Sequence, residues 1–519
     1  MAKVSAKGGF NLFWGQAVST GISALGIIIV ARLLSPSEYG IYTIAMTVPT
    51  LIVTFRDWGV DRAIIKYAAQ YNSENKLANV KRILVAGAVF EIILGLSLTA
   101  LSFLLAGFLS TSVFQRPNLK PLIQIASLII LGDALVTAAQ SALIGLEKMG
   151  LTSINMVVQS CLRAFLMPLL IILGLGTFGA TLGASAALAI AGLFSILILS
   201  SLYKKLQKPS DYTFKIVETM KTMLKFGLPL SMSAIIGGFL TQFYNILIAI
   251  YTTNLMIGNY SVATNFAVLI GFFAMPVSTV LFPAFSKLDS QKERETLRNV
   301  FQFSVKYAAL LVVPATALII SLSQPAISTL FGEEYSEAPL FLALFAINYL
   351  FSAFGILSLG NLINSQGETR VNLLLTLVTS AIGFPLSILL IPRFGIIGLI
   401  ITTLIAGIPS LILGLWWIKA HFGATVDWVS STKILLGSTA AAAMTYVIIS
   451  QLSFSSWIKL IIGAIIFLLA LLPITLSMRT VSRSDINNLR EMVSELGPLS
   501  NLLNFLLKTI EKLITIFEF

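Results

Sequence analysis

The sequence predicts an all-α integral membrane protein with about 14 transmembrane helices, arranged as two pseudo-symmetric six-helix bundles plus two C-terminal helices. Hydrophobic residues make up 57% of the 519 residues and charged residues only 11%, whereas soluble globular chains carry about 25% charged residues. The apolar stretches are long enough to cross roughly 30 Å of hydrocarbon as helices, and barrel strands would be half that length and alternating in polarity.

An internal repeat predicts the two bundles. Gly40 and Tyr42 reappear as Gly258 and Tyr260, an offset of 218 positions. The further matches, at offsets that fall from 218 to 215, are Ala45 with Ala263, Asn155 with Asn372, Pro168 with Pro385, Phe178-Gly179 with Phe394-Gly395, and Ala191-Gly192 with Ala406-Gly407. Repeats of this kind are typical of transporters whose substrate path runs between the two copies.

The chain divides into five parts. We expect an N-terminal six-helix bundle at 1–203, a cytoplasmic linker at 204–223, a C-terminal six-helix bundle at 224–420, transmembrane helices 13 and 14 within 421–480, and a cytoplasmic amphipathic tail at 481–519. The predicted spans are 12–33, 39–58, 83–108, 119–145, 152–174, 177–202, 224–250, 256–285, 299–322, 338–362, 371–391, 395–418, 432–450 and 457–478. An even number of crossings separates the copies, so both take the same orientation.

The boundaries of these parts follow polarity. The linker is the longest polar connection and is rich in lysine, and the tail interleaves leucines with charged residues around Gly497-Pro498, which is typical of an interrupted helix lying on a membrane surface. If both termini are cytoplasmic, nearly all Lys and Arg fall on the cytoplasmic side. The exceptions on the other side are Arg32, Arg116, Lys120, Arg393 and Lys459. This asymmetry is the positive-inside rule, and it predicts a multi-pass protein of the cytoplasmic membrane of a prokaryote.

The composition also excludes several functions. The net charge of +12 belongs to loops facing anionic lipid headgroups, so we expect membrane lipids and no nucleic acid as partners. The single Cys161 lies inside a span, and no nucleotide-binding, zinc-ligand or nucleophile motif is present. We therefore expect no enzyme activity, no cofactor and no metal.

Ionisable residues inside spans are the first candidates for function, because a charge at the bilayer centre costs about 2.5 to 3.5 kcal/mol on the lenient insertion scale. Asp133 and Arg163 fall near the middle of consecutive spans, and antiparallel packing brings them to the same depth. Two interpretations stay open: a buried ion pair that joins two helices, or a role in a substrate cavity.

Cations gather at the end of the second span. Arg56, Arg62 and Lys66 predict a cationic mouth facing the cytoplasm, suited to a phosphate or diphosphate headgroup, and Lys306 in span nine offers a matching cation. Plain positive-inside anchoring and snorkelling explain the same residues without a ligand.

Amides mark the first span of each copy, with Gln16 in the first bundle and Gln242 and Asn245 in the second. Amides beside aromatic rings are typical of sugar-binding surfaces, because hydroxyls need donors and acceptors while sugar rings stack on aromatic planes. Interhelical hydrogen bonding is the alternative interpretation.

The segment ARLLSPSEYGIYTIA, which begins at Ala31, resembles the polysaccharide transporter family, the lipid-linked oligosaccharide flippases of the multidrug, oligosaccharidyl-lipid and polysaccharide exporter superfamily. Further segments that fit this family are GVDRAIIKYAAQY from Gly59, LFGEEYSEAP from Leu330, INSQGETR from Ile363 and IPRFGIIGLIITTLIAG from Ile391. The resemblance covers about residues 10–480.

The resemblance implies two six-helix bundles arranged as a V, two additional helices, and alternating access that moves a polyprenyl-(di)phosphate-linked oligosaccharide from the inner to the outer leaflet. It implies a structural motif at Arg32, Tyr39 and Gly40, of which Arg32 matches a recurrent family arginine. The family's cavity cations vary, so the cations proposed above rest on this sequence alone. A glycan polymerase or glycosyltransferase machinery is the protein partner that such a substrate implies.

Three other functions stay open. An ion-coupled multidrug antiporter has a similar architecture, but it usually has twelve spans and membrane carboxylates, and spans one and seven to twelve here contain no Asp or Glu. A murein-precursor lipid flippase shares the fourteen spans and would carry an arginine cluster in its first two spans. A scaffold without transport is the third alternative, which the polar bundle interiors disfavour.

Overall fold

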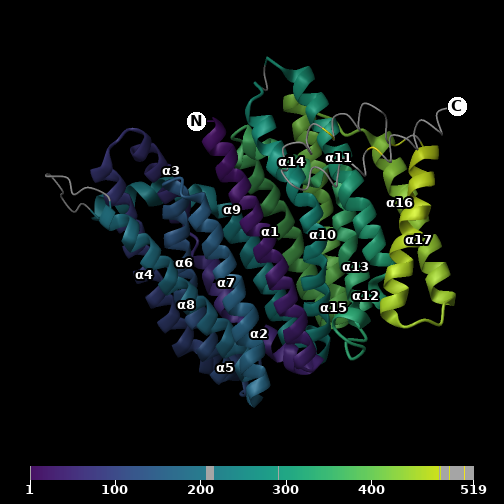
Figure 1. Cartoon of the computed structure of the whole chain (residues 1–519), viewed down its shortest axis with the longest axis horizontal. Coiled ribbons are helices and arrows are strands. Elements are labelled where there is room, and N and C mark those ends of the chain that lie inside the picture. Colours follow the sequence, from purple (N-terminus) through teal and green to yellow (C-terminus); the bar gives the residue numbers. More distant parts are fainter. Residues whose placement is uncertain are drawn as a thin grey trace. The chain divides into compact units, whose positions relative to one another are not determined.

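The structure, a computed structural model, describes residues 2–205, 216–289 and 292–478, together with 480, 490 and 508 (Figure 1). Within these residues the chain forms helices and turns and no strand. The helices are α1 (Ala2–Leu33), α2 (Pro36–Arg56), α3 (Val60–Ser73), α4 (Leu77–Phe108), α5 (Leu119–Ala126), α6 (Leu128–Gly145), α7 (Met149–Leu170), α8 (Gly176–Lys205), α9 (Ile216–Tyr251), α10 (Asn254–Ser286), α11 (Arg294–Ser321), α12 (Ser323–Leu330), α13 (Ala338–Leu350), α14 (Ile356–Ser365), α15 (Thr369–Phe422), α16 (Trp428–Gln451) and α17 (Ser456–Ser477). Short π-helical turns follow α4 and α7, and a 3-10 turn joins α13 to α14.

The helices are long and apolar enough to make this a multi-pass membrane protein. Among the described residues, nine helices qualify by length and composition to cross a membrane, or ten if the bent pair α13–α14 forms one span. Two of the nine, Met149–Lys204 and Thr369–Phe422, run for 56 and 54 residues, more than twice what one crossing needs. Each is broken by a glycine. With α2 and α10 added, this arrangement is consistent with the predicted fourteen crossings.

The two breaks share one backbone conformation. Gly176 has φ 49° and ψ −132°, and Gly395 has φ 55° and ψ −128°. Residues other than glycine rarely adopt this backbone conformation. Three residues after each of them, Gly179 and Gly398 pack closely against a backbone carbonyl of the preceding helix. The structure therefore pairs Gly179 with Gly398, and the sequence match of Gly179 with Gly395 was wrong by three residues at this turn.

Contacts divide the chain into two compact units. The first unit comprises Met1–Asn265 and Thr376–Ala406. In it α1 packs along α7, α6 packs between α4 and α8, and α9 packs against α2, α3 and α4. Aromatic rings of α9 and α15 also meet here, with Phe243 and Phe384 at 5.0 Å between ring centroids. The first unit thus holds the helices of the first repeat together with α9, the first part of α10 and a part of α15.

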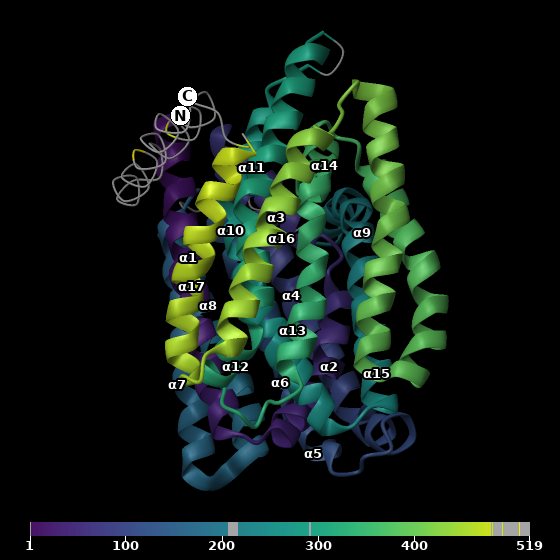
Figure 2. The same cartoon turned by 90° about the vertical axis from the view of Figure 1, so that its right-hand side faces the viewer.

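The second unit comprises Phe266–Leu375 and Gly407–Phe519. Its core packs Phe285, Phe301 and Leu362 against the end of α15, and α16 packs along both α11 and α17 (Figure 2). The assignment of 1–203 and 224–420 to two bundles remains a prediction.

Helix boundaries extend beyond several predicted spans. α4 begins at Leu77 and α9 at Ile216, so each starts several residues before the predicted membrane entry. Part of the predicted linker is therefore helical, while 206–215 lie outside the described residues. The short helices α3 and α12 fall in segments for which no span was predicted. The predicted tail, 481–519, also lies outside the described residues apart from 490 and 508.

Candidate functional site

A capped turn fixes the start of α2, which forms one wall of the candidate site. Ser35 Oγ accepts a hydrogen bond from Glu38 N at 3.3 Å, and Ser35 N donates to Glu38 Oε2 at 2.9 Å. Pro36 occupies the first helical turn, where its missing N–H costs nothing. One turn further, Gly40 packs against the backbone of Asn254 at the start of α10. The SPSEYG segment therefore positions the Tyr39 and Tyr42 side chains.

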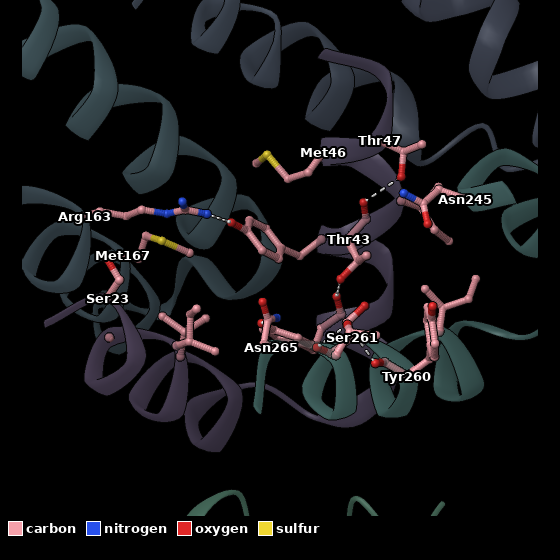
Figure 3. A pocket seen from close by; sticks show the side chains of 18 of the residues that line it. Ser23, Thr43, Met46, Thr47, Arg163, Met167, Asn245, Tyr260, Ser261 and Asn265 are labelled. Atoms are coloured by element: carbon pink, nitrogen blue, oxygen red, sulfur yellow. Dashed lines mark hydrogen bonds between the residues drawn. The ribbon is translucent and has the colours of Figure 1, made fainter. Parts of the chain in front are cut away.

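A cavity of about 260 Å³ lies among α1, α2, α7, α9 and the first part of α10 (Figure 3). Its polar lining consists of Ser23, Tyr39, Tyr42, Thr43, Thr47, Arg163, Asn245, Tyr260, Ser261, Thr264 and Asn265. We call it the tyrosine cavity. Of the described residues in its wall, Arg163 alone is charged.

Arg163 is held by a tyrosine and faces this cavity. Its Nη2 donates to the Tyr42 hydroxyl at 3.2 Å, and the Tyr42 ring lies 5.8 Å from the Tyr39 ring between centroids. The Tyr39 hydroxyl accepts from Asn265 Nδ2 at 3.1 Å. The Arg163 side chain is nevertheless solvent-accessible, because it opens onto the cavity. One accessible guanidinium thus stands in a wall of hydroxyls and amides.

A second cavity of about 270 Å³ lies among α2, α6, α7 and α8. We call it the carboxylate cavity, because Asp133 lines it together with Thr50, Gln159 and Arg163. Arg163 therefore belongs to the walls of both cavities. Asp133 and Arg163, which were expected at the same depth, thus line one cavity, and their equal depth in the membrane remains a prediction.

The ion pair of Asp133 differs from the sequence expectation. Arg56 Nη2 pairs with Asp133 Oδ2, and Arg56 Nη1 pairs with Glu91 Oε2. Arg56 Nη2 also donates to Thr137 Oγ1 at 3.2 Å. The proposed pairing of Asp133 with Arg163 is therefore corrected: the last turn of α2 brings Arg56 between α4 and α6, and both acids turn toward it.

The three cations expected at one mouth are divided. Arg56 is buried among carboxylates, whereas Arg62 and Lys66 are exposed on α3. Arg62 Nη1 donates to the backbone oxygen of Leu230 at 2.8 Å, and Lys66 Nζ lies 3.8 Å from the centre of the Phe226 ring. Both contacts are with α9. Exposed cation–π contacts of this kind contribute about 0.5–1 kcal/mol.

The other predicted residues occupy separate places. Gln16 donates to Thr20 Oγ1 on its own helix at 3.3 Å and is absent from both cavity walls. Gln242 is buried and accepts from Asn245 at 3.1 Å, and Asn245 lines the tyrosine cavity. Arg32 is exposed in the last turn of α1. Lys306 lies on α11 in the second unit, where it interacts electrostatically with Asp427.

Sequence reasoning missed most hydroxyls of the tyrosine cavity. Tyr39, Thr43 and Thr47 recur every four residues along α2, and this spacing of polar residues in an apolar span was the available signal. The part of the chain that the structure describes contains no group of three or more metal-ligating side chains close enough to hold an ion.

Two protein families and a curated relative match this chain. The family described as polysaccharide biosynthesis protein matches residues 5–289, and the family described as lipid II flippase MurJ matches residues 160–468. The probable low-salt glycan biosynthesis flippase Agl15 of Haloferax volcanii is 22% identical over 94% of this chain and 99% of its own length.

Two solved structures share the fold. The lipid II flippase MurJ in an inward closed conformation superimposes with a TM-score of 0.73, at 18% identity, over 89% of this chain and 97% of its own. A multidrug resistance transporter of the MATE family in an inward-facing conformation superimposes with a TM-score of 0.64, at 17% identity, over 80% and 94%. The polysaccharide biosynthesis match spans more than half of the chain, and the chain therefore belongs to that family, as its motifs predicted.

Proposed function

We propose that this protein is a flippase that moves a polyprenyl-(di)phosphate-linked oligosaccharide from the inner to the outer leaflet of a prokaryotic cytoplasmic membrane by alternating access. The tyrosine cavity carries this proposal, because it combines one accessible guanidinium with a wall of hydroxyls and amides. The family name and the flippase among the relatives support the same substrate class.

The chemistry of the cavity suits both ends of such a headgroup. The Arg163 guanidinium offers a planar fork of donors for a phosphate. Asn245 and Asn265 offer both donors and acceptors for sugar hydroxyls, and the tyrosine rings offer flat apolar faces. The lipid tail stays in the bilayer.

A stripe of threonines on α2 extends this surface. The Thr43, Thr47 and Thr50 hydroxyls donate to backbone oxygens four residues earlier, at 2.9, 3.1 and 2.7 Å. With their hydrogens engaged, these oxygens remain acceptors for sugar hydroxyls. Thr43 and Thr47 line the tyrosine cavity and Thr50 lines the carboxylate cavity, so the stripe provides a polar track along α2.

The remaining cations take separate roles in the proposal. Arg62 and Lys66, exposed on α3, attract the phosphate at the cytoplasmic surface. Lys306 remains a candidate cation for the phosphate within the second unit. Arg56 holds Glu91 and Asp133, and so acts on the phosphate only through the charge of that cluster. Gln16 and Gln242 support α1 and α9 through hydrogen bonds, and Asp133 contributes to the cavity wall.

Alternating access requires that contacts at the two ends of α2 open in turn. Gly40 packs on Asn254 at the start of α10, and Gly59 packs on Gly227 of α9, so both ends of α2 are closed within the first unit. We place the Gly59 contact and both chain termini on the cytoplasmic side by the positive-inside rule. The substrate passes without covalent change, and a glycan polymerase or glycosyltransferase on either side of the membrane supplies or consumes it.

A murein-precursor flippase is the second candidate, because the MurJ family matches residues 160–468 and the substrates share an anionic lipid diphosphate. The multidrug antiporter has less support, because the charged residue that faces the tyrosine cavity is a cation.

Translocation in proteoliposomes tests the proposal. A fluorescent polyprenyl-diphosphate oligosaccharide is placed in both leaflets, and a membrane-impermeant reductant quenches the outer pool. Quenching beyond the outer fraction, with the purified protein and not with empty vesicles, is the expected result. Absence of such quenching across several lipid-linked sugars, with transport of cationic dyes driven by an ion gradient, contradicts the proposal. A lipid-linked murein precursor tested in parallel distinguishes the two flippase functions.

A further inference from the structure

The charged cluster formed by Arg56 on α2, Glu91 on α4 and Asp133 on α6 contains two acids and one base. Arg56 is shared by Glu91 and Asp133, and in the described part of the chain it is the one cation that forms a salt bridge with either acid. Both the Arg56 and Glu91 side chains are almost completely buried, at 5% and 4% exposure. A formal charge of −1 in such a place is costly unless something compensates it.

The surrounding helices supply few charges that face this cluster. The charged residues in electrostatic contact with Glu91 are Arg56, Asp61 and Asp133. Asp61, on α3, has Arg62 and Asp57 as its own charged neighbours besides Arg56. The residues that α8 contributes to the carboxylate cavity are apolar. Apart from Glu91, the charged residues of α4, α5 and α9 lie toward the starts of those helices: Lys81, Arg82, Lys120, Glu218, Lys221 and Lys225.

Arg163 shares the carboxylate cavity with this cluster, because its side chain and that of Asp133 line the same cavity. A phosphate bound at Arg163 therefore adds negative charge to a cavity whose wall already holds the Asp133 carboxylate. The Asp133 side chain is 32% exposed, so cavity water reaches it and can deliver a proton.

We propose that Glu91 and Asp133 together form a site for one exchangeable proton, whose binding is linked to the binding of an anionic headgroup at Arg163. The inference rests on the proposed function, because it takes Arg163 as the anion site. The proton moves from cavity water to a carboxylate oxygen when the anion arrives and returns to water when the anion leaves. By reciprocity, protonation strengthens anion binding by the same factor that anion binding strengthens protonation.

Proton counting by calorimetry tests this linkage. The purified full chain in detergent is titrated with farnesyl diphosphate in two buffers of equal pH and different ionisation enthalpy, and the difference in heat gives the protons taken up per ligand. The variants are Glu91→Gln and Asp133→Asn, each of which leaves Arg56 with one carboxylate and so keeps a balanced buried pair. Glu333→Gln, at an exposed loop residue, is the matched control.

The wild type and the control are expected to take up about one proton more per ligand than at least one of the two variants, since a neutral amide imitates the protonated acid. That variant should bind the diphosphate at least as tightly as the wild type and with a flatter pH dependence. If proton uptake is lost in only one of the two variants, the proton binds to the carboxyl group that this variant replaces. Equal uptake in the wild type and both variants overturns the linkage and leaves the anion site intact. Absence of binding to the wild type overturns the anion site itself, and the proposed phosphate role of Arg163 with it.

Discussion

Gly40 of α2 and Gly258 of α10 make reciprocal contacts within the first unit. Gly40 packs against the backbone carbonyl of Asn254, and Gly258 packs against the backbone carbonyl of Pro36. Each glycine is four residues after the residue that its counterpart touches, and both pairs are related by the repeat offset of 218. The duplication therefore has a physical counterpart: the starts of two equivalent helices cross at a point where neither tolerates a side chain.

The substitution Gly258→Ala is expected to weaken this crossing. A Cβ at either glycine would overlap a backbone carbonyl, which cannot rotate away as a flexible side chain would. Overpacking of this kind costs about 1–3 kcal/mol, so the thermal midpoint in detergent should fall. Flipping in proteoliposomes should slow as well, because the crossing must close once in every transport cycle.

Gly271→Ala is the matched control for the crossing. Gly271 lies on the same helix, and a Cβ there meets nothing within 4 Å. Its thermal midpoint should stay unchanged or rise, because alanine favours helix over glycine by about 1 kcal/mol. A Gly258→Ala protein with the midpoint and flipping rate of this control would show that the contact is not part of the cycle.

Arg163→Ala is expected to reduce diphosphate binding and flipping by about ten- to a hundredfold, which corresponds to the loss of about 1.5–3 kcal/mol from a hydrogen bond to a charged group. Arg163→Lys keeps the charge but loses the planar fork of donors, so its binding and flipping should fall between those of the wild type and those of Arg163→Ala. Binding is measured by calorimetry with farnesyl diphosphate and flipping by fluorescence quenching. Arg370→Ala, at an exposed residue outside both cavities, should behave as the wild type. Similar losses in Arg163→Ala and Arg370→Ala would show that Arg163 is not part of the anion site.

The positions of the helices could be predicted from the sequence, but the partners of the buried charged side chains could not. Apolar length predicted the spans because a bilayer dictates helix length, and every predicted span is overlapped by a helix of the structure, whereas α3 and α12 lie outside the spans. Asp133 and Arg163, which the sequence placed near the middle of consecutive spans, line one cavity. Which charged side chains pair with one another could not be predicted, because pairing depends on how each helix is rotated about its own axis. Arg56, predicted at a membrane surface, turns inward to Glu91 and Asp133 for this reason.

Arg56→Met is expected to destabilise the protein strongly, because it leaves two carboxylates in the interior without their cation. Breaking one partner of a buried ion pair costs about 3–5 kcal/mol. Adding Glu91→Gln and Asp133→Asn to the same chain should restore much of the thermal midpoint, since no buried charge is then left in the cluster. The midpoint is measured by intrinsic fluorescence. A triple variant no more stable than Arg56→Met would show that packing of the guanidinium, rather than its charge, holds α2 to α4 and α6.

The stability of the α3 region should depend on pH through Asp61. Burial raises the pKa of Asp61 above its ordinary value, and its Oδ1 accepts no hydrogen bond in the described structure. An acid whose pKa is higher in the folded state binds its proton more tightly there, so the folded state is favoured at low pH. The free energy of unfolding should therefore decrease as the pH rises from the ordinary pKa of about 3.9 through the folded value, and level off above it.

Asp61→Asn should remove this decrease and raise the thermal midpoint at neutral pH, because the amide carries no charge to bury. Asp427, at the start of α16, provides a comparison of opposite sign. Burial works to raise the pKa of Asp427, but hydrogen bonds from Ser430 and from the Val429 backbone outweigh it and hold the pKa below its ordinary value. Asp427 therefore contributes stability at neutral pH that is lost as the pH falls, and Asp427→Asn should lower the midpoint at neutral pH. Thermal midpoints of both variants and the wild type between about pH 4 and 7 separate the two effects. If Asp61→Asn instead follows the wild-type pH profile throughout this range, the pKa of Asp61 does not differ between the folded and unfolded states, and the expected difference in sign between the two acids is wrong.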